Sequence, residues 1–96
     1  MMRREFFSKW LEENTSLASS SIAKYAGAIN TISKELLDKK LIDYHLYKTN
    51  DSVLAEKARM TYFSIQEFKD KDERGNRMYS RALIYYIQFL QDKNNL

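Results

Sequence analysis

The sequence contains no cysteine and no proline, and it has only two glycines and one histidine. Without cysteine the chain forms no disulfide and no thiolate metal site, which fits a reducing compartment. With so little glycine and proline, it lacks the turn residues that an all-β domain needs between its strands. Helices joined by short turns are therefore the expected architecture.

The scarcity of catalytic residue types argues against an enzyme. His45 is the only histidine, and no neighbouring nucleophile marks it as an activated acid or base. The chain also lacks a P-loop and a glycine-rich nucleotide-binding motif. Asp70, Asp72 and Glu73 alternate with basic residues, which is typical of a solvated charged turn rather than a magnesium site. We expect no enzyme activity from this chain by itself, no cofactor and no metal site.

Long apolar runs are missing as well. No stretch approaches the roughly 20 apolar residues of a transmembrane helix, and the N-terminal segment MMRREFFSKW lacks the apolar core of a signal peptide. We therefore expect a cytoplasmic, prokaryotic protein. The formal net charge of +3, from 16 basic and 13 acidic residues, is only mildly basic. Binding to nucleic acid would have to come from local clustering of the basic residues.

The chain does have enough apolar residues for one core. Hydrophobic residues make up 44% of the 96 residues and aromatic residues 14%, which predicts a single helical domain over residues 1–96. In residues 76–91, apolar side chains cover most of the circumference of a helix, and one polar stripe includes Arg77 and Arg81. This pattern predicts a buried central helix with Asn76 as its N-cap.

Two helices are expected in the first part of the chain. Residues 3–13 place aromatic side chains on one helical face, which favours core packing. Residues 22–38 repeat apolar side chains at helical spacing, and the serines at 19–21 are typical N-cap residues. Within this second helix, Gly27 is small enough to let another backbone approach closely.

The middle of the chain is less regular. Residues 41–48 fit either a short extended link or a single helical turn, and Asp51 or the residue after it starts a third helix. A fourth short helix is expected within residues 61–71, where Ser64 and a glutamate three positions later have capping-box spacing. The charged run KDKDERGN, residues 69–76, then predicts a turn into the central helix. The expected fold is an all-α compact bundle of about five helices around the C-terminal helix.

The start of the central helix gathers residue types that bind nucleic acid. A helix N-terminus offers backbone N–H groups and a positive dipole end to a phosphate, and arginine and asparagine can read guanine and adenine edges. Serines and a lysine also begin the second helix, a pattern suited to phosphate contacts. A structural alternative is that the serines cap the helix and that the arginines pair with nearby carboxylates. The candidate DNA-binding residues are Ser21, Lys24, Arg74, Asn76, Arg77, Tyr79 and Arg81.

Two segments together resemble a known module. They are SSSIAKYAGAINTISKELL, residues 19–37, and FKDKDERGNRMYSRALIYYIQFL, residues 68–90. A Ser-x-x-x-x-Tyr helix followed by Gly-Asn-x-Met-Tyr-Ser-x-Ala-Leu resembles the small helical module at the N-terminus of many prokaryotic restriction endonucleases, including McrBC-like and HNH-type enzymes. More distantly, the pattern resembles the core-binding helical domain of tyrosine recombinases. The likeness covers nearly the whole chain.

The resemblance implies that the chain recognises double-stranded DNA in a restriction-modification type defence system. It also implies that a C-terminal nuclease or NTPase domain of the parent protein cuts the DNA or drives translocation. The chain contains neither motif, so it is expected to be an isolated recognition domain or a stand-alone relative. Two alternatives stay open: a protein–protein interaction module, which the abundant tyrosines permit, and a small phage or plasmid regulator that binds a partner protein.

Overall fold

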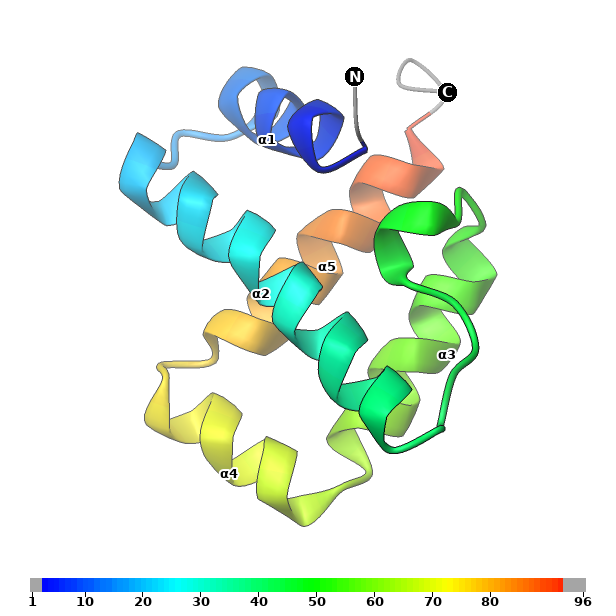
Figure 1. Cartoon of the computed structure of the whole chain (residues 1–96). Helices are drawn as coiled ribbons and strands as arrows, with labels where there is room; N and C mark the ends of the chain where they lie inside the picture. Colours follow the sequence, from blue (N-terminus) through cyan, green and yellow to red (C-terminus); the bar gives the residue numbers. More distant parts are fainter. Residues whose placement is uncertain (1–2, 93–96) are drawn as a thin grey trace.

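The computed structural model describes residues 3–92, and it confirms the all-α architecture. The helices form a compact globule in which both ends of the described chain lie on the same side (Figure 1). None of these helices combines the length and the continuous hydropathy that crossing a membrane requires. The elements are α1 (Arg3–Asn14), α2 (Ser19–Asp38), the 3-10 turn η1 (Leu46–Lys48), α3 (Ser52–Phe63), α4 (Gln66–Arg74) and α5 (Met78–Gln91).

The C-terminal helix α5 is the packing centre of the bundle, as its apolar pattern predicted. It packs most extensively against α2, which crosses it, and against α3 (Figure 1). Tyr86 is fully buried at this junction, where its hydroxyl donates to the Leu46 carbonyl of η1 and its ring meets Phe7 of α1 edge-on at 5.1 Å. On the opposite stripe, Ile84 is 47% exposed and Arg81 is exposed. One face of α5 therefore reaches solvent while the others hold the core.

The expected charged turn before α5 is wrong, because most of residues 69–76 belong to α4. The capping box at Ser64 is also wrong. Ser64 instead ends α3, and its hydroxyl donates to the Thr61 carbonyl. The first turn of α4 is positioned by packing: Phe68 is buried and stacks on Tyr62 of α3 with ring centroids 4.3 Å apart. The buried pair of Phe68 and Tyr62 thus holds this segment as a helix against α3, although its charged composition had suggested a turn.

Residues 41–48 contain both of the conformations that the sequence allowed. The chain is irregular up to His45 and then forms the single turn η1. The predicted start of the third helix is confirmed, since Asp51 is the N-cap of α3 and its carboxylate accepts the Val53 N–H at 2.9 Å. α1 is joined to η1 by the Arg3 guanidinium, which donates to the Tyr47 carbonyl at 2.8 Å.

Candidate nucleic-acid interface

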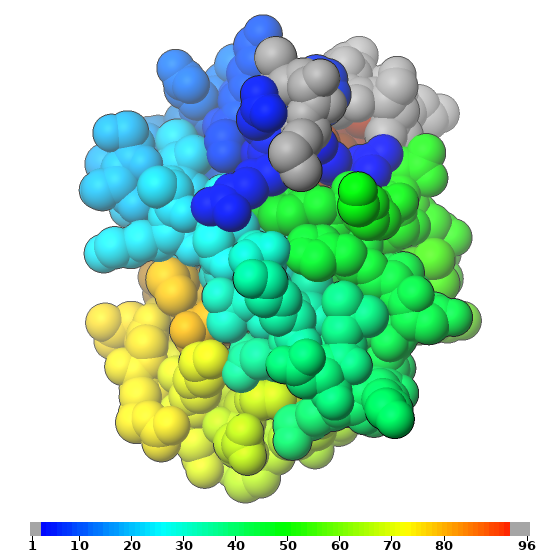
Figure 2. Space-filling view, in the orientation of Figure 1, coloured from blue at the N-terminus to red at the C-terminus, as the bar shows by residue number. Residues whose placement is uncertain are grey.

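Four of the predicted site residues meet at one surface hollow, although they come from two distant segments. Ser21 and Lys24 of the α2 start face Asn76 and Arg81 of the α4–α5 junction across a cavity of about 170 Å³. In Figure 2 the first residues of α5, in orange, are visible between the α2 start, in cyan, and α4, in yellow. An adjoining hollow of about 440 Å³ adds Arg77, and Glu73 also lines it. We refer to these residues as the basic corner: Ser21, Lys24, Asn76, Arg77 and Arg81.

The three cations of the basic corner, Lys24, Arg77 and Arg81, are all exposed and take part in no ion pair. Only two ion pairs join residues within 3–92, Arg59 to Glu56 and Lys71 to Glu35. The structural alternative, in which the arginines pair with the carboxylates of α4, is therefore wrong. These positive charges remain available to a ligand of opposite charge.

The turn that presents the arginines has an unusual backbone. Asn76 and Arg77 both adopt left-handed conformations, with φ of 56° and 63°, whereas the neighbouring Gly75 has φ of −94°. Asparagine tolerates this region, but for arginine it costs roughly 1–2 kcal/mol. The Arg77 N–H donates to the Asp72 carbonyl at 2.7 Å, which helps to hold the turn. Asn76 is therefore not the N-cap of α5; Arg77 occupies that position and its side chain makes no capping bond.

The N-terminus of α5 is already occupied by a carboxylate. Asp72 of α4 is 6% exposed, and its Oδ1 accepts the Ser80 N–H at 3.0 Å. It thus supplies the negative charge that a helix start favours. The expectation that this helix end offers free N–H groups to a phosphate is wrong for Met78 and Ser80, whose N–H groups bond to the Gly75 carbonyl and to Asp72. Sequence reasoning placed Asp72 in a solvated turn, because no local rule predicts a cap supplied from the preceding helix.

The open helix start belongs to α2. Its N-cap is Ala18, whose side chain cannot accept a hydrogen bond, and the first helical bond runs from the Ile22 N–H to the Ala18 carbonyl. The N–H groups of residues 19–21 have no partner within the described chain. The prediction that the serines cap α2 is therefore wrong. Instead they occupy the first turn, where their N–H groups and hydroxyls lie one turn before Lys24.

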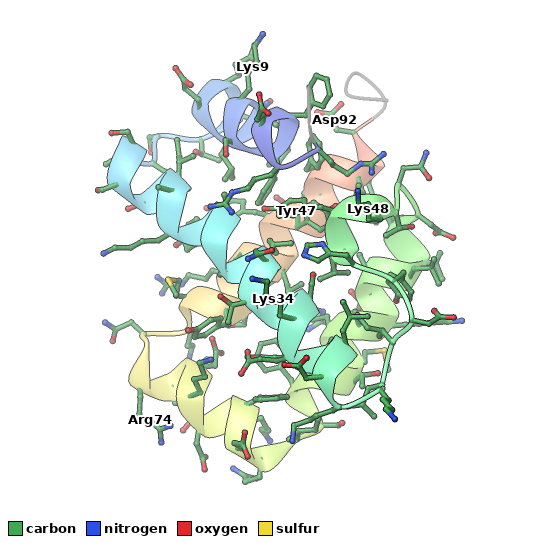
Figure 3. All side chains as sticks on the ribbon, viewed as in Figure 1. Lys9, Lys34, Tyr47, Lys48, Arg74 and Asp92 are labelled. Carbon is green, nitrogen blue, oxygen red and sulfur yellow. The ribbon has the colours of Figure 1, made fainter. Side chains whose placement is uncertain are left out.

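The two remaining candidates lie outside the basic corner. The Tyr79 ring takes part in packing between α4 and α5, with the Lys71 ammonium 4.9 Å from its centroid and the Tyr62 ring centroid 6.5 Å away. Arg74 is exposed at the end of α4 and lines neither hollow; Figure 3 shows it at the edge of the molecule. A cation at this position suits the negative end of the α4 dipole.

His45 is held in its neutral form. Its Nδ1 accepts the Tyr47 N–H at 3.1 Å, so the ring proton is on Nε2, which lies 3.0 Å from Oδ1 of Asn30. Burial lowers the pKa of His45, and the positive charges of Lys48 and Lys34 lower it further. Every ring nitrogen thus has a structural partner. Within residues 3–92, no cluster of three or more histidine or acidic side chains is arranged to hold a metal ion.

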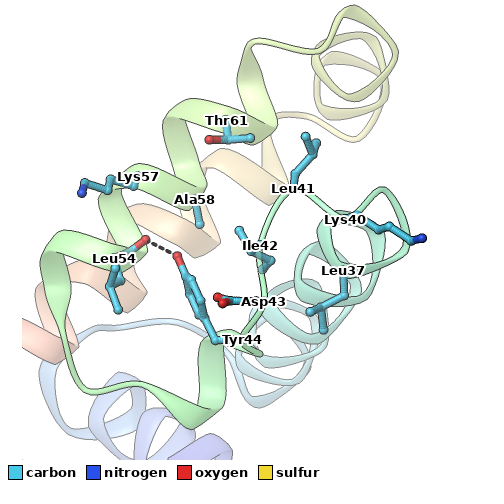
Figure 4. A pocket seen from close by; sticks show the side chains of 10 residues that line it. All are labelled: Leu37, Lys40, Leu41, Ile42, Asp43, Tyr44, Leu54, Lys57, Ala58 and Thr61. Carbon is cyan, nitrogen blue, oxygen red and sulfur yellow. Dashed lines mark hydrogen bonds between the residues drawn. The ribbon is translucent and has the colours of Figure 1, made fainter.

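A larger hollow of about 670 Å³ lies away from the basic corner, between the end of α2, residues 40–44 and α3 (Figure 4). Its lining is mixed: Leu37, Leu41, Ile42 and Leu54 are apolar, whereas Lys40, Asp43 and Lys57 are charged. The Tyr44 hydroxyl donates to the Leu54 carbonyl at 2.9 Å and closes one side of the hollow (Figure 4). The hollow thus combines apolar side chains with charged ones of both signs.

Comparison of the chain with protein-family models, with curated proteins and with solved structures yields no match.

Proposed function

We propose that this chain binds double-stranded DNA as the recognition module of a restriction-type defence system, and that the basic corner is the DNA contact. The observation that carries the proposal is the convergence of residues from 21–24 and 76–81 at one surface with three unpaired, exposed cations. The resemblance to the helical module of restriction endonucleases supplies the biological context. Cutting of the DNA is assigned to a C-terminal nuclease or NTPase domain of the parent protein.

The two halves of the basic corner have different tasks in this proposal. The first turn of α2 offers unpartnered N–H groups, and with Lys24 it holds one phosphate of the DNA backbone. Asn76 and Arg77 of the α4–α5 turn and Arg81 of α5 are side chains of the types that read guanine and adenine edges in the major groove. Because Asp72 occupies the start of α5, the side chains rather than the helix end make the contact there.

The test is a fluorescence-anisotropy titration of Arg77→Ala and Arg81→Ala with a labelled duplex at low salt. Each side chain that reads a base is expected to contribute about 1–3 kcal/mol to binding, so affinity falls about tenfold for each 1.4 kcal/mol lost. Thermal unfolding should not change, because both side chains are exposed and unpaired. Methylated and unmethylated duplexes are compared in the same assay.

A matched control is the double variant Lys9→Ala/Lys57→Ala. It removes two exposed positive charges from α1 and α3, outside the basic corner. We expect it to bind DNA almost as the wild type does. If the Arg77 and Arg81 variants also retain full affinity, the assigned contact is wrong.

A protein partner is the second candidate, and a specific feature favours it. Leu41 at the rim of the larger hollow is 46% exposed, and Val53 and Met60 of α3 are 59% and 63% exposed. Exposed apolar side chains of this size are typical of protein-binding surfaces when they gather on one face. Absence of DNA binding by the wild type at low salt would favour this function over the first.

A further inference from the structure

One stripe of α2 carries exposed lysines beyond the basic corner. Lys24, Gly27, Thr31 and Lys34 follow one another at steps of three and four residues, so they share one face of the helix. Between Ser19 and Lys34 the sequence contains no aspartate or glutamate. The whole first part of α2 therefore presents positive charge without an acidic neighbour on the same helix.

Adjacent elements add cations to this stripe. From α1, Arg4 places a guanidinium nitrogen 3.8 Å from where a Cβ on Gly27 would lie. From η1, Lys48 adds a further exposed cation, three residues after His45. Figure 3 shows Lys34, Tyr47 and Lys48 gathered around the junction of α2 with η1. We call Arg4, Lys24, Lys34 and Lys48 the α2 face.

The cations of the α2 face have no ion-pair partners within residues 3–92, and all four are exposed. Glu35 is the first acidic residue of α2, and it pairs with none of these cations. Its carboxylate accepts the Tyr62 hydroxyl and forms an ion pair with Lys71. Gly27 was expected to receive another backbone, but that prediction is wrong for the described chain. Only the Arg4 guanidinium comes within 4 Å of the position of its missing Cβ. The centre of the stripe is half-buried, and the side chain of Arg4 lies beside it.

We propose that the α2 face binds the phosphate backbone of the same duplex whose bases meet the basic corner, so that the DNA lies along α2 as far as η1. This inference rests on the proposed function. Lys24 and Lys34 are ten positions apart, which corresponds to about 15 Å along the helix. One strand of duplex DNA presents a phosphate for every roughly 3.4 Å of axis. The stripe therefore matches several consecutive phosphates, and the Arg4 guanidinium beside Gly27 adds a positive charge at its centre.

The test uses the full chain and the dependence of binding on salt. Each phosphate contact that is lost should reduce the slope of log K against log salt by about 0.9, so Lys34→Ala/Lys48→Ala should reduce it by about 1.8. Affinity should weaken equally for all duplex sequences, because phosphate contacts carry no base information. Lys34→Arg/Lys48→Arg, which keeps both charges, should retain the wild-type slope.

The control variant Lys9→Ala/Lys57→Ala has the same change in net charge, and Figure 3 shows Lys9 at the opposite end of the molecule from Arg74, pointing outward from α1. It should retain the wild-type slope. An unchanged slope for Lys34→Ala/Lys48→Ala, or an equal loss in the control, overturns the assignment of the α2 face. If Arg77→Ala still weakens binding in that case, the proposed function stands. A wild-type chain that binds no duplex at low salt overturns both.

Discussion

Replacing Ser33 by alanine tests the polar contact that joins α2 to η1. Ser33 is fully buried; its Oγ donates to the Ile29 carbonyl at 2.8 Å and accepts the Leu46 N–H at 3.1 Å. Alanine removes the acceptor but leaves almost the same shape. The Leu46 N–H, on a residue that is itself fully buried, then has no partner.

The expected loss follows from these two bonds. An unsatisfied buried donor costs about 1–3 kcal/mol, whereas the Ile29 carbonyl keeps its ordinary helical hydrogen bond. Alanine regains up to about 0.5 kcal/mol through its higher helix propensity. We therefore expect Ser33→Ala to lower the free energy of unfolding by about 1–2 kcal/mol. For a chain of this size that corresponds to a fall in Tm of roughly 5–15 °C.

The measurement is urea unfolding followed by far-UV circular dichroism, with Thr31→Ala as the matched control. The Thr31 hydroxyl also donates to the carbonyl four residues earlier, that of Gly27 at 3.1 Å, but it accepts no hydrogen bond. Its removal should change stability by less than about 0.5 kcal/mol. If both variants unfold at the same urea concentration, the bond between Ser33 and the Leu46 N–H contributes nothing to stability and our reasoning is refuted.

Two further predictions concern stability. Gly27→Ala should raise the free energy of unfolding by about 0.5–1 kcal/mol, because the site is helical and has room for a methyl group; a lower urea midpoint would contradict the space seen there. Since His45 is neutral in the fold and its pKa is lowered, first by burial and then by Lys48 and Lys34, the unfolded chain binds a proton more readily. The free energy of unfolding should therefore decline as pH falls below about 6.5. Between about pH 7 and about pH 5.5, the decline should be smaller in His45→Gln than in the wild type. An equal decline in both would exclude His45 as its source.

The sequence predicted the helices well where the signal is local. Scarce glycine, absent proline and regular apolar spacing determined an all-α fold with a buried C-terminal helix, and α3 starts where Asp51 indicated. These features depend on side chains a few positions apart on one helix, so no knowledge of the neighbours is needed. Four of the candidate residues, Ser21, Lys24, Asn76 and Arg81, line one hollow. Their binding of DNA stays a prediction.

Only the tertiary structure decided which helix start is open. Both α2 and α5 begin with residues suited to phosphate binding, but Asp72 folds back from α4 onto α5, while Ala18 leaves the first turn of α2 unoccupied. The left-handed turn at Asn76 and Arg77 likewise arises because α4 continues to Arg74, held by buried Phe68. The carboxylate at the start of α5 and the turn before it both depend on where α4 packs. Such contacts between separate elements are not encoded in the spacing of residues along any one of them.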